Sequence, residues 1–181
     1  NVSALNPAVE IKGIVAFSPF NSMNKLIRDI AKQKTKLNLS ILSPFFDIVN
    51  FVRFGKTGTL RTCDTINSNN IPTLVLHGGN DTQVTIKNSP VGKKHKIQDN
   101  PNARTVLYES KYHNVYLERE AEQYLNDTIG KIESLGKNSP EAYEIYQNID
   151  YSLITKEDIS VMETVSAFLE ECVMKRDFLT E

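Results

Sequence analysis

Three runs of apolar residues alternate along the chain with segments that have the spacing of amphipathic helices. The runs are IKGIVAFSPF at 11–20, IPTLVLHGG at 71–79 and ARTVLYES at 103–110. Runs with so few polar interruptions are typical of strands covered on both faces, as in a parallel sheet. The order of the elements therefore predicts an α/β fold with a mostly parallel sheet and flanking helices.

The helical segments carry recognisable start and stop signals. They are expected at 23–33, 43–54, 117–136, 139–149 and 156–175. Ser43, Ser139 and Thr155 are the predicted N-caps, the first two with proline at the first helical position. Gly136 is a predicted C-terminal stop. The glycine-containing stretch 55–62 lacks the order of a phosphate-binding loop and no strand precedes it, so we expect an ordinary loop there.

The stretch between the first two strands is longer than a crossover requires. A crossover needs about a dozen residues, whereas residues 21–70 separate these strands. Its segment SPFFDIVNFVRF at 43–54 is unusually apolar, which indicates either a helix buried in the core or a lid over an apolar pocket. The excess length favours an inserted helical cap at 21–70, with 1–20 and 71–181 forming the core domain.

The overall composition limits the classes of partner. A chain of 181 residues with 40% hydrophobic residues suits one domain of ordinary size. Its net charge of −1 and the absence of long runs of one sign argue against a nucleic-acid surface. Cys63 and Cys172 lie far apart without CxxC spacing, so we expect no zinc site or disulfide framework, and a cytoplasmic location. No apolar stretch approaches the roughly 20 residues that span a bilayer, so no transmembrane segment is expected.

Two side chains stand after the ends of successive strands. Asp81 follows Gly78 and Gly79, which we expect to turn the chain with positive φ, and His113 follows the next strand. Ligands bind at the carboxyl ends of such strands. A carboxylate that accepts a hydrogen bond from imidazole fixes its tautomer and frees the other nitrogen to act as a general base.

Each of these residues also has a structural interpretation. An aspartate after glycine is commonly a turn residue, and a histidine near a strand end is commonly a satisfied, half-buried group. The matched positions of Asp81 and His113 favour a functional pair over both. His77 lies within the second strand and is expected to be a structural, hydrogen-bonded histidine, whereas His95 is expected in solvent.

The segments LVLHGGNDTQV at 74–84 and YHNVY at 112–116 resemble the C-terminal half of the α/β-hydrolase fold. The likeness is greatest to lid-bearing esterases, lysophospholipases, monoacylglycerol lipases and serine aminopeptidases. It implies that Asp81 is the triad acid and His113 the triad base, with no cofactor and no metal. The resemblance covers about residues 9–135. Tyr112 stands where many members have glycine.

The resemblance also implies where an ester substrate would bind. The side chains expected to line that apolar site are Phe20, Phe45, Phe46, Phe51 and Val84. The expected partner is a small-molecule ester or lipid-like substrate.

The triad serine of this family lies in a G-x-S-x-G segment before the acid, and the 181-residue sequence contains no such segment. We therefore expect the chain to be part of a longer hydrolase whose serine and main oxyanion donor precede Asn1. Within the chain, Ser18 lacks flanking glycines and is followed by proline, and Ser110 is close to His113 in sequence, so neither is favoured as nucleophile. Alternatives to an esterase are a non-catalytic hydrolase-like binding domain and a serine peptidase with the same triad.

Overall fold

The computed structural model describes residues 11–35, 43–69, 71–97 and 100–177. At its centre is a sheet in which β2 (Thr73–Gly78) lies between β1 (Ile14–Phe17) and β3 (Ala103–Tyr108). Both strand pairs are parallel. Together with the surrounding helices, this parallel sheet confirms the predicted α/β class.

Helices join the strands throughout the described part of the chain. The α-helices are α1 (Met23–Thr35), α2 (Ser43–Phe54), α3 (Thr62–Ser68), α4 (Arg119–Leu135), α5 (Pro140–Gln147), α6 (Tyr151–Ile154) and α7 (Ile159–Asp177). The short 3₁₀-helices are η3 (Gly55–Thr59), η4 (Ile86–Asn88) and η5 (Val91–Lys96).

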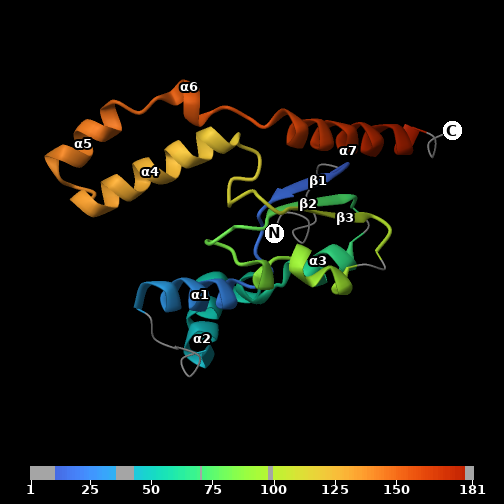
Figure 1. Ribbon diagram of the computed structural model, residues 1–181. Helices are drawn as coiled ribbons and strands as arrows, with labels where there is room; N and C mark the ends of the chain where they lie inside the picture. The colour runs from blue at the N-terminus through green and yellow to red at the C-terminus, as the bar shows by residue number, and fades with distance from the viewer. Residues whose placement is uncertain (1–10, 36–42, 70, 98–99, 178–181) are drawn as a thin grey trace.

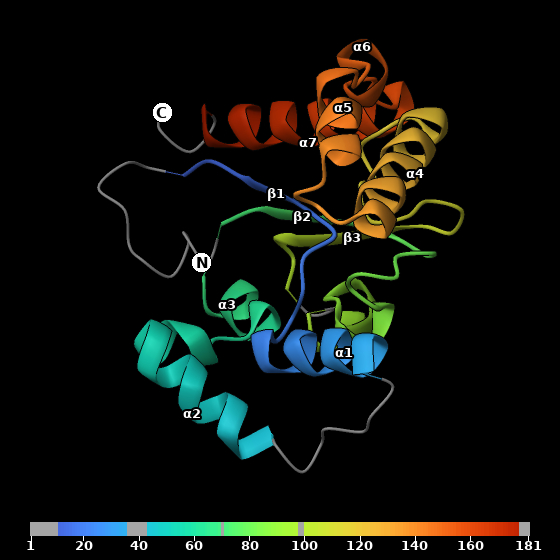
Figure 2. The same ribbon diagram turned by 90° about the vertical axis from the view of Figure 1, so that its left-hand side faces the viewer.

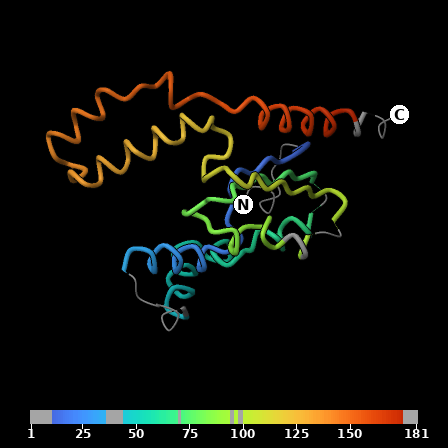
Figure 3. The backbone as a smooth tube through the Cα atoms, in the orientation of Figure 1, coloured from blue at the N-terminus to red at the C-terminus, as the bar shows by residue number. Residues whose placement is uncertain are grey.

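The helices form two layers with the sheet between them. Figures 1 and 2 show α7 over one face of the sheet, and α3, α1 and α2 on the opposite side. The backbone trace shows the chain leaving the sheet through α4 and returning through α5 and α6 to α7 (Figure 3). This arrangement leaves the carboxyl ends of the strands for the loops that carry the predicted site.

Alternate side chains of β2 supply the two halves of the core. Leu74 and Leu76 pack with one face of α7, whose contributing side chains are Val161, Val165, Phe168 and Cys172. Val75 points to the other face, where it packs with Cys63 and Ile66 of α3. Both faces of β2 are therefore buried, as its continuous apolar run predicted. Because α3 belongs to this core cluster, part of the segment 21–70 packs directly on the sheet.

The outer strands are less buried than their sequences indicated. β1 has only four residues, all half-buried, and β3 is mostly half-buried. β3 nevertheless packs against the core on both faces, through Val106 and Tyr108 on one face and Leu107 on the other, so the outer strands are covered less completely than predicted. The reason is position: β2 has a neighbouring strand on each side, whereas β1 and β3 form the edges of this three-stranded sheet.

Two of the predicted capping signals are confirmed and one is wrong. Ser139 accepts a hydrogen bond from the amide of Ala142, and Gly136 ends α4 with φ 84°, as predicted. The predicted cap Thr155 was wrong, because α7 begins at Ile159 and Asp158 accepts the amides of its first turn. The stretch expected to be an ordinary loop contains η3.

Helix α2 has the opposite orientation to an ordinary amphipathic helix. Its Asn50 is 3% exposed and bonds to Asn24 of α1, while Phe45 and Val52 are 60% and 77% exposed. The interpretation of this segment as a helix buried in the core is therefore wrong. Its apolar side faces outwards, which leaves the lid interpretation open.

Candidate active site

The loops after β2 and β3 approach each other so closely that only glycine fits between them. A Cβ atom on Gly78 would overlap the carbonyl oxygens of Tyr112 and Lys111, and one on Gly79 would lie 2.6 Å from the carbonyl oxygen of Glu109. Neither glycine has a positive φ, so the predicted reason for the pair was wrong. The glycines are required because another segment of backbone passes over them.

Main-chain hydrogen bonds continue beyond the ends of the two strands. The amide of Gly79 donates to the carbonyl of Tyr108 at 2.9 Å, and that of Asn80 donates to the carbonyl of Lys111 at 2.9 Å. The two loops are thereby held side by side. This pairing places Asp81 within reach of His113, although 32 residues separate them.

The two carboxylate oxygens of Asp81 have different partners. Oδ1 accepts the amides of Gln83 and Val84, both at 2.8 Å. Oδ2 lies 2.8 Å from Nδ1 of His113, and the aspartate side chain is fully buried. The ordinary turn role and the pairing role therefore coexist in one residue. The turn bonds to Oδ1 fix the orientation of the carboxylate, and Oδ2 remains to pair with His113.

The Asp81 contact sets the chemistry of the His113 ring. Donation from Nδ1 to the carboxylate leaves Nε2 as the unprotonated nitrogen of the neutral imidazole, on a side chain that is 31% exposed. The hydrogen bond to Asp81 raises the pKa of His113 above its ordinary 6.5, while partial burial opposes the rise and nearby Glu122 adds to it. The ring is therefore built to take up a proton at Nε2.

A second histidine lies beside the same carboxylate. His77 is fully buried, and its Nε2 donates to the carbonyl of Val84 at 3.0 Å, which agrees with the expected structural role. The same nitrogen is 3.6 Å from Oδ2 of Asp81, too far for a hydrogen bond. Burial lowers the pKa of His77, against the opposing effect of Asp81, so this ring is held neutral.

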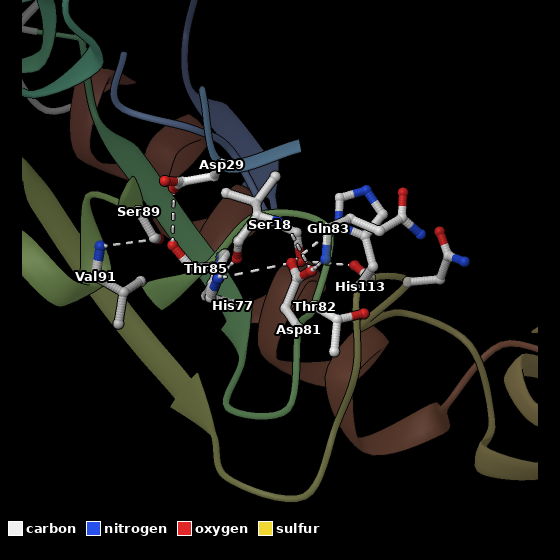
Figure 4. Close-up of polar contacts among 12 residues, drawn as sticks. Ser18, Asp29, His77, Asp81, Thr82, Gln83, Thr85, Ser89, Val91 and His113 are labelled. Carbon is white, nitrogen blue, oxygen red and sulfur yellow. Dashed lines mark hydrogen bonds and ion pairs between the residues drawn. The ribbon is translucent and has the colours of Figure 1, made fainter. Parts of the chain in front are cut away.

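Two residues that the sequence did not assign to the site hold the main chain around His113. The hydroxyl of Ser18 donates to the carbonyl oxygen of His113 at 2.6 Å, and the carboxylate of Glu122 accepts the amide of Asn114 at 2.7 Å. Figure 4 shows Ser18, His77 and Asp81 gathered beside His113. The burial of Glu122 depends on the rotation of α4 about its axis, which the sequence does not give, and Ser18 was considered only as a nucleophile.

The five residues predicted to bind substrate do not surround one pocket. Phe20 lines a cavity of about 410 Å³, along with Ile14 and Val75 of the sheet and Phe54. The other four are placed elsewhere: Phe45 and Phe51 are exposed on α2, Phe46 is half-exposed there, and Val84 is buried in the Asp81 turn. Of the five, only Phe20 therefore lines this cavity.

No protein-family model, curated protein or solved structure matches this chain. Within the described ranges, no helix is both long enough and apolar enough to span a membrane. Nor do three potential metal ligands come together in the part of the chain that the structure describes. The candidate site therefore rests on the local geometry around Asp81 and His113.

Proposed function

We propose that this chain carries the acid and the base of a serine hydrolase of the α/β-hydrolase kind, acting on carboxylic esters. The observation that supports the proposal is the 2.8 Å contact between Oδ2 of Asp81 and Nδ1 of His113. Both residues follow adjacent parallel strands, and the base is partly exposed whereas the acid is buried. The proposed nucleophile is a serine in sequence that precedes Asn1.

In the proposed reaction His113 transfers protons in both halves of the cycle. Its Nε2 takes the proton of the serine hydroxyl as the serine oxygen attacks the ester carbonyl carbon. The protonated ring then gives that proton to the departing alcohol, which leaves an acyl-enzyme. In the second half Nε2 takes a proton from water as the water oxygen attacks the acyl carbon. The ring then returns that proton to the serine oxygen as its bond to the acyl carbon breaks, which releases the carboxylic acid and restores the serine.

In this scheme Asp81 orients the neutral His113 ring and stabilises the protonated one. Its Oδ2 holds the Nδ1–H tautomer, which aims the lone pair of Nε2 away from the carboxylate. Because Oδ1 is occupied by two amides, the carboxylate is held in one orientation. The negative charge then stabilises the imidazolium that forms when Nε2 is protonated.

The apolar surface of α2 supports an ester with an acyl chain or another apolar group. Phe45, Phe51 and Val52 point outwards from α2. The polar residues Asp47 and Asn50 of the same helix bond to α1. In a cap over the site, such a surface would favour apolar over charged substrates. The cap and its placement over the substrate are part of the proposal.

The test begins with the gene upstream of Asn1, which should encode a G-x-S-x-G segment. The extended protein should then hydrolyse short p-nitrophenyl esters and react covalently with a fluorophosphonate probe. His113→Ala should abolish both reactions, whereas His95→Ala is the matched control and should change neither. Probe labelling that is unaffected by His113→Ala would exclude the proposed base, and a replaced serine would favour a binding domain. Profiling of ester and amide substrates distinguishes an esterase from a peptidase.

A further inference from the structure

Ser18 has an unusual backbone conformation. Its φ of 45° is the only positive value found for a non-glycine residue in the described part of the chain. Side chains with a Cβ atom disfavour this left-handed region, so such residues persist only where their surroundings hold them in place. The surroundings of Ser18 therefore indicate what its conformation achieves.

Two hydrogen bonds hold Ser18, one to β2 and one to the loop after β3. Its amide donates to the carbonyl of Leu76 at 2.8 Å, which continues the β1–β2 pairing. Its hydroxyl donates at 2.6 Å to the main-chain carbonyl of His113, 95 residues away in sequence. The residue is only 4% exposed, so neither bond competes strongly with water. The strained turn thus aims the hydroxyl at the loop that carries the base.

The contact of Ser18 is one of three that fix His113. Asp81 holds the ring at Nδ1, and Glu122, which is 2% exposed, accepts the amide of the following residue, Asn114. Ser18 holds the carbonyl between these two points. Because the imidazole is joined to this backbone through one Cβ atom, a shift of the carbonyl changes the position of Nδ1 relative to Asp81.

We propose that Ser18 is a positioning residue that keeps the imidazole of His113 aligned with Asp81 by holding the histidine's own carbonyl oxygen. Its hydroxyl proton is committed to that main-chain acceptor, so it is not the nucleophile. The catalytic consequence rests on the proposed function of His113 as a base. The alignment of the ring with Asp81 does not rest on that function, because it involves only residues of this chain.

The direct test is a histidine NMR titration of the 181-residue chain carrying Ser18→Gly. Glycine accepts a φ of 45° without strain, and the change removes the hydroxyl contact together with the Cβ atom. The pKa of His113 should fall from its raised value towards 6.5, because the bond to Asp81 is less well aligned, while the His77 signals stay unchanged. Ser110→Gly is the matched control, since Ser110 is exposed on the same loop as His113. That variant should leave the His113 titration as it is.

Several results would overturn the positioning role. One is an unchanged His113 titration in a folded Ser18→Gly chain, and another is a Ser18→Gly chain that fails to fold, since Ser18 would then serve the fold alone. Ser18→Ala, which keeps the strained backbone, should lower the His113 pKa in the same direction. An effect confined to Ser18→Ala would mean that strain, and not the hydroxyl, is responsible.

A second measurement uses the extended, ester-hydrolysing protein. Ser18→Gly should lower kcat about tenfold, as expected for the loss of one useful hydrogen bond, with KM unchanged. Fluorophosphonate labelling at Ser18 itself would overturn the assignment, because the residue would then be the nucleophile. Absence of any hydrolysis in the parent protein would contradict the proposed function only, since the NMR titration needs no activity.

Discussion

The carbonyl oxygen of Tyr112 occupies the space that a side chain at position 78 would need. Gly78 is the last residue of β2, and Tyr112 immediately precedes the proposed base. The contact therefore joins the end of the acid's strand to the loop of the histidine. It explains why a continuous apolar strand ends in glycine although that glycine has no special backbone angle.

Gly78→Ala should consequently be strongly destabilising, although it adds only one methyl group. The added methyl group must displace the backbone at Lys111 and Tyr112, and overpacking of this kind costs about 1–3 kcal/mol or more. Chemical denaturation measures the loss. Gly130→Ala is the matched control: Gly130 lies within α4 with nothing near its Cβ position, so that variant should gain about 0.5–1 kcal/mol. Equal stabilities of the two variants would contradict the close approach.

Removal of the Asp81 charge should lower the pKa of His113. The hydrogen bond to Asp81 is the main cause of the raised value, so Asp81→Asn should shift the NMR titration of His113 to lower pH. In the proposed hydrolase the base must be neutral, so the rate should rise as pH passes this pKa. Asp81→Asn should move that rise to lower pH and reduce kcat on the order of 10³–10⁴-fold. Asp127→Asn, on the exposed side of α4, is the control and should alter neither quantity.

The two site histidines should give stability opposite dependences on pH. His77 titrates below 6.5 when folded, so the unfolded chain binds its proton first and stability should fall as pH drops from about 6.5 through the lowered pKa. His77→Gln keeps a donor for Val84 but cannot be protonated, and it should remove this loss. Urea denaturation at a series of pH values provides the measurement.

His113→Gln provides the contrast for that experiment. The folded pKa of His113 is raised, so its stabilisation is fully present below 6.5 and is lost as pH rises through the raised value. Replacement should therefore reduce stability chiefly on the acid side of this range. If both replacements change the pH profile in the same direction, the assigned protonation states are wrong.

The start of α7 should depend on Asp158 both as a cap and as an ion-pair partner. Asp158 accepts amides of the first turn through Oδ1, and its Oδ2 lies 2.5 Å from the ammonium of Lys111 on the histidine loop. Asp158→Ala should cost about 1 kcal/mol through loss of the cap. Asp158→Asn keeps the cap and removes only the charge, so it should be the milder change in thermal unfolding at pH 7.

The ion pair between Lys111 and Asp158 should also make the stability of the protein depend on pH in acid. The bond from Lys111 is the main cause that lowers the pKa of Asp158 to about 2. This contribution to stability should be present above about 3.8 and lost as pH falls through about 2. Lys111→Met should flatten that part of the acid profile. Persistence of the full acid dependence in Lys111→Met would show that the ammonium is not the cause.

The sequence predicted the parts of the site that depend on strand order. Asp81 and His113 follow consecutive apolar runs, and parallel pairing of those runs is enough to bring them together. The role of Gly78 was missed because the overlapping backbone comes from a loop more than 30 residues later in the sequence. Ser18 was missed because neither its φ nor its partner can be read from the AFSPF segment.

The orientation of α2 could not be predicted for a different reason. Seven of the twelve residues of SPFFDIVNFVRF are Phe, Ile or Val, so the composition does not say which side faces the protein. The structure resolves this through polar contacts from Asn24 to Asp47 and Asn50. These hydrogen bonds hold the polar side of α2 against α1, and Phe45, Phe51 and Phe54 are exposed as a result.

The lengths of chain enclosed by the site contacts suggest an order of assembly. The bond between Asp81 and His113 closes a loop of 32 residues, whereas the bond from Ser18 to the same histidine spans 95. Longer loops cost more entropy to close and generally form later. We expect the acid–base pair to be made with the β2–β3 unit and to be locked only when β1 docks. The titration of His113 would then report, at a single atom, whether the last strand is in place.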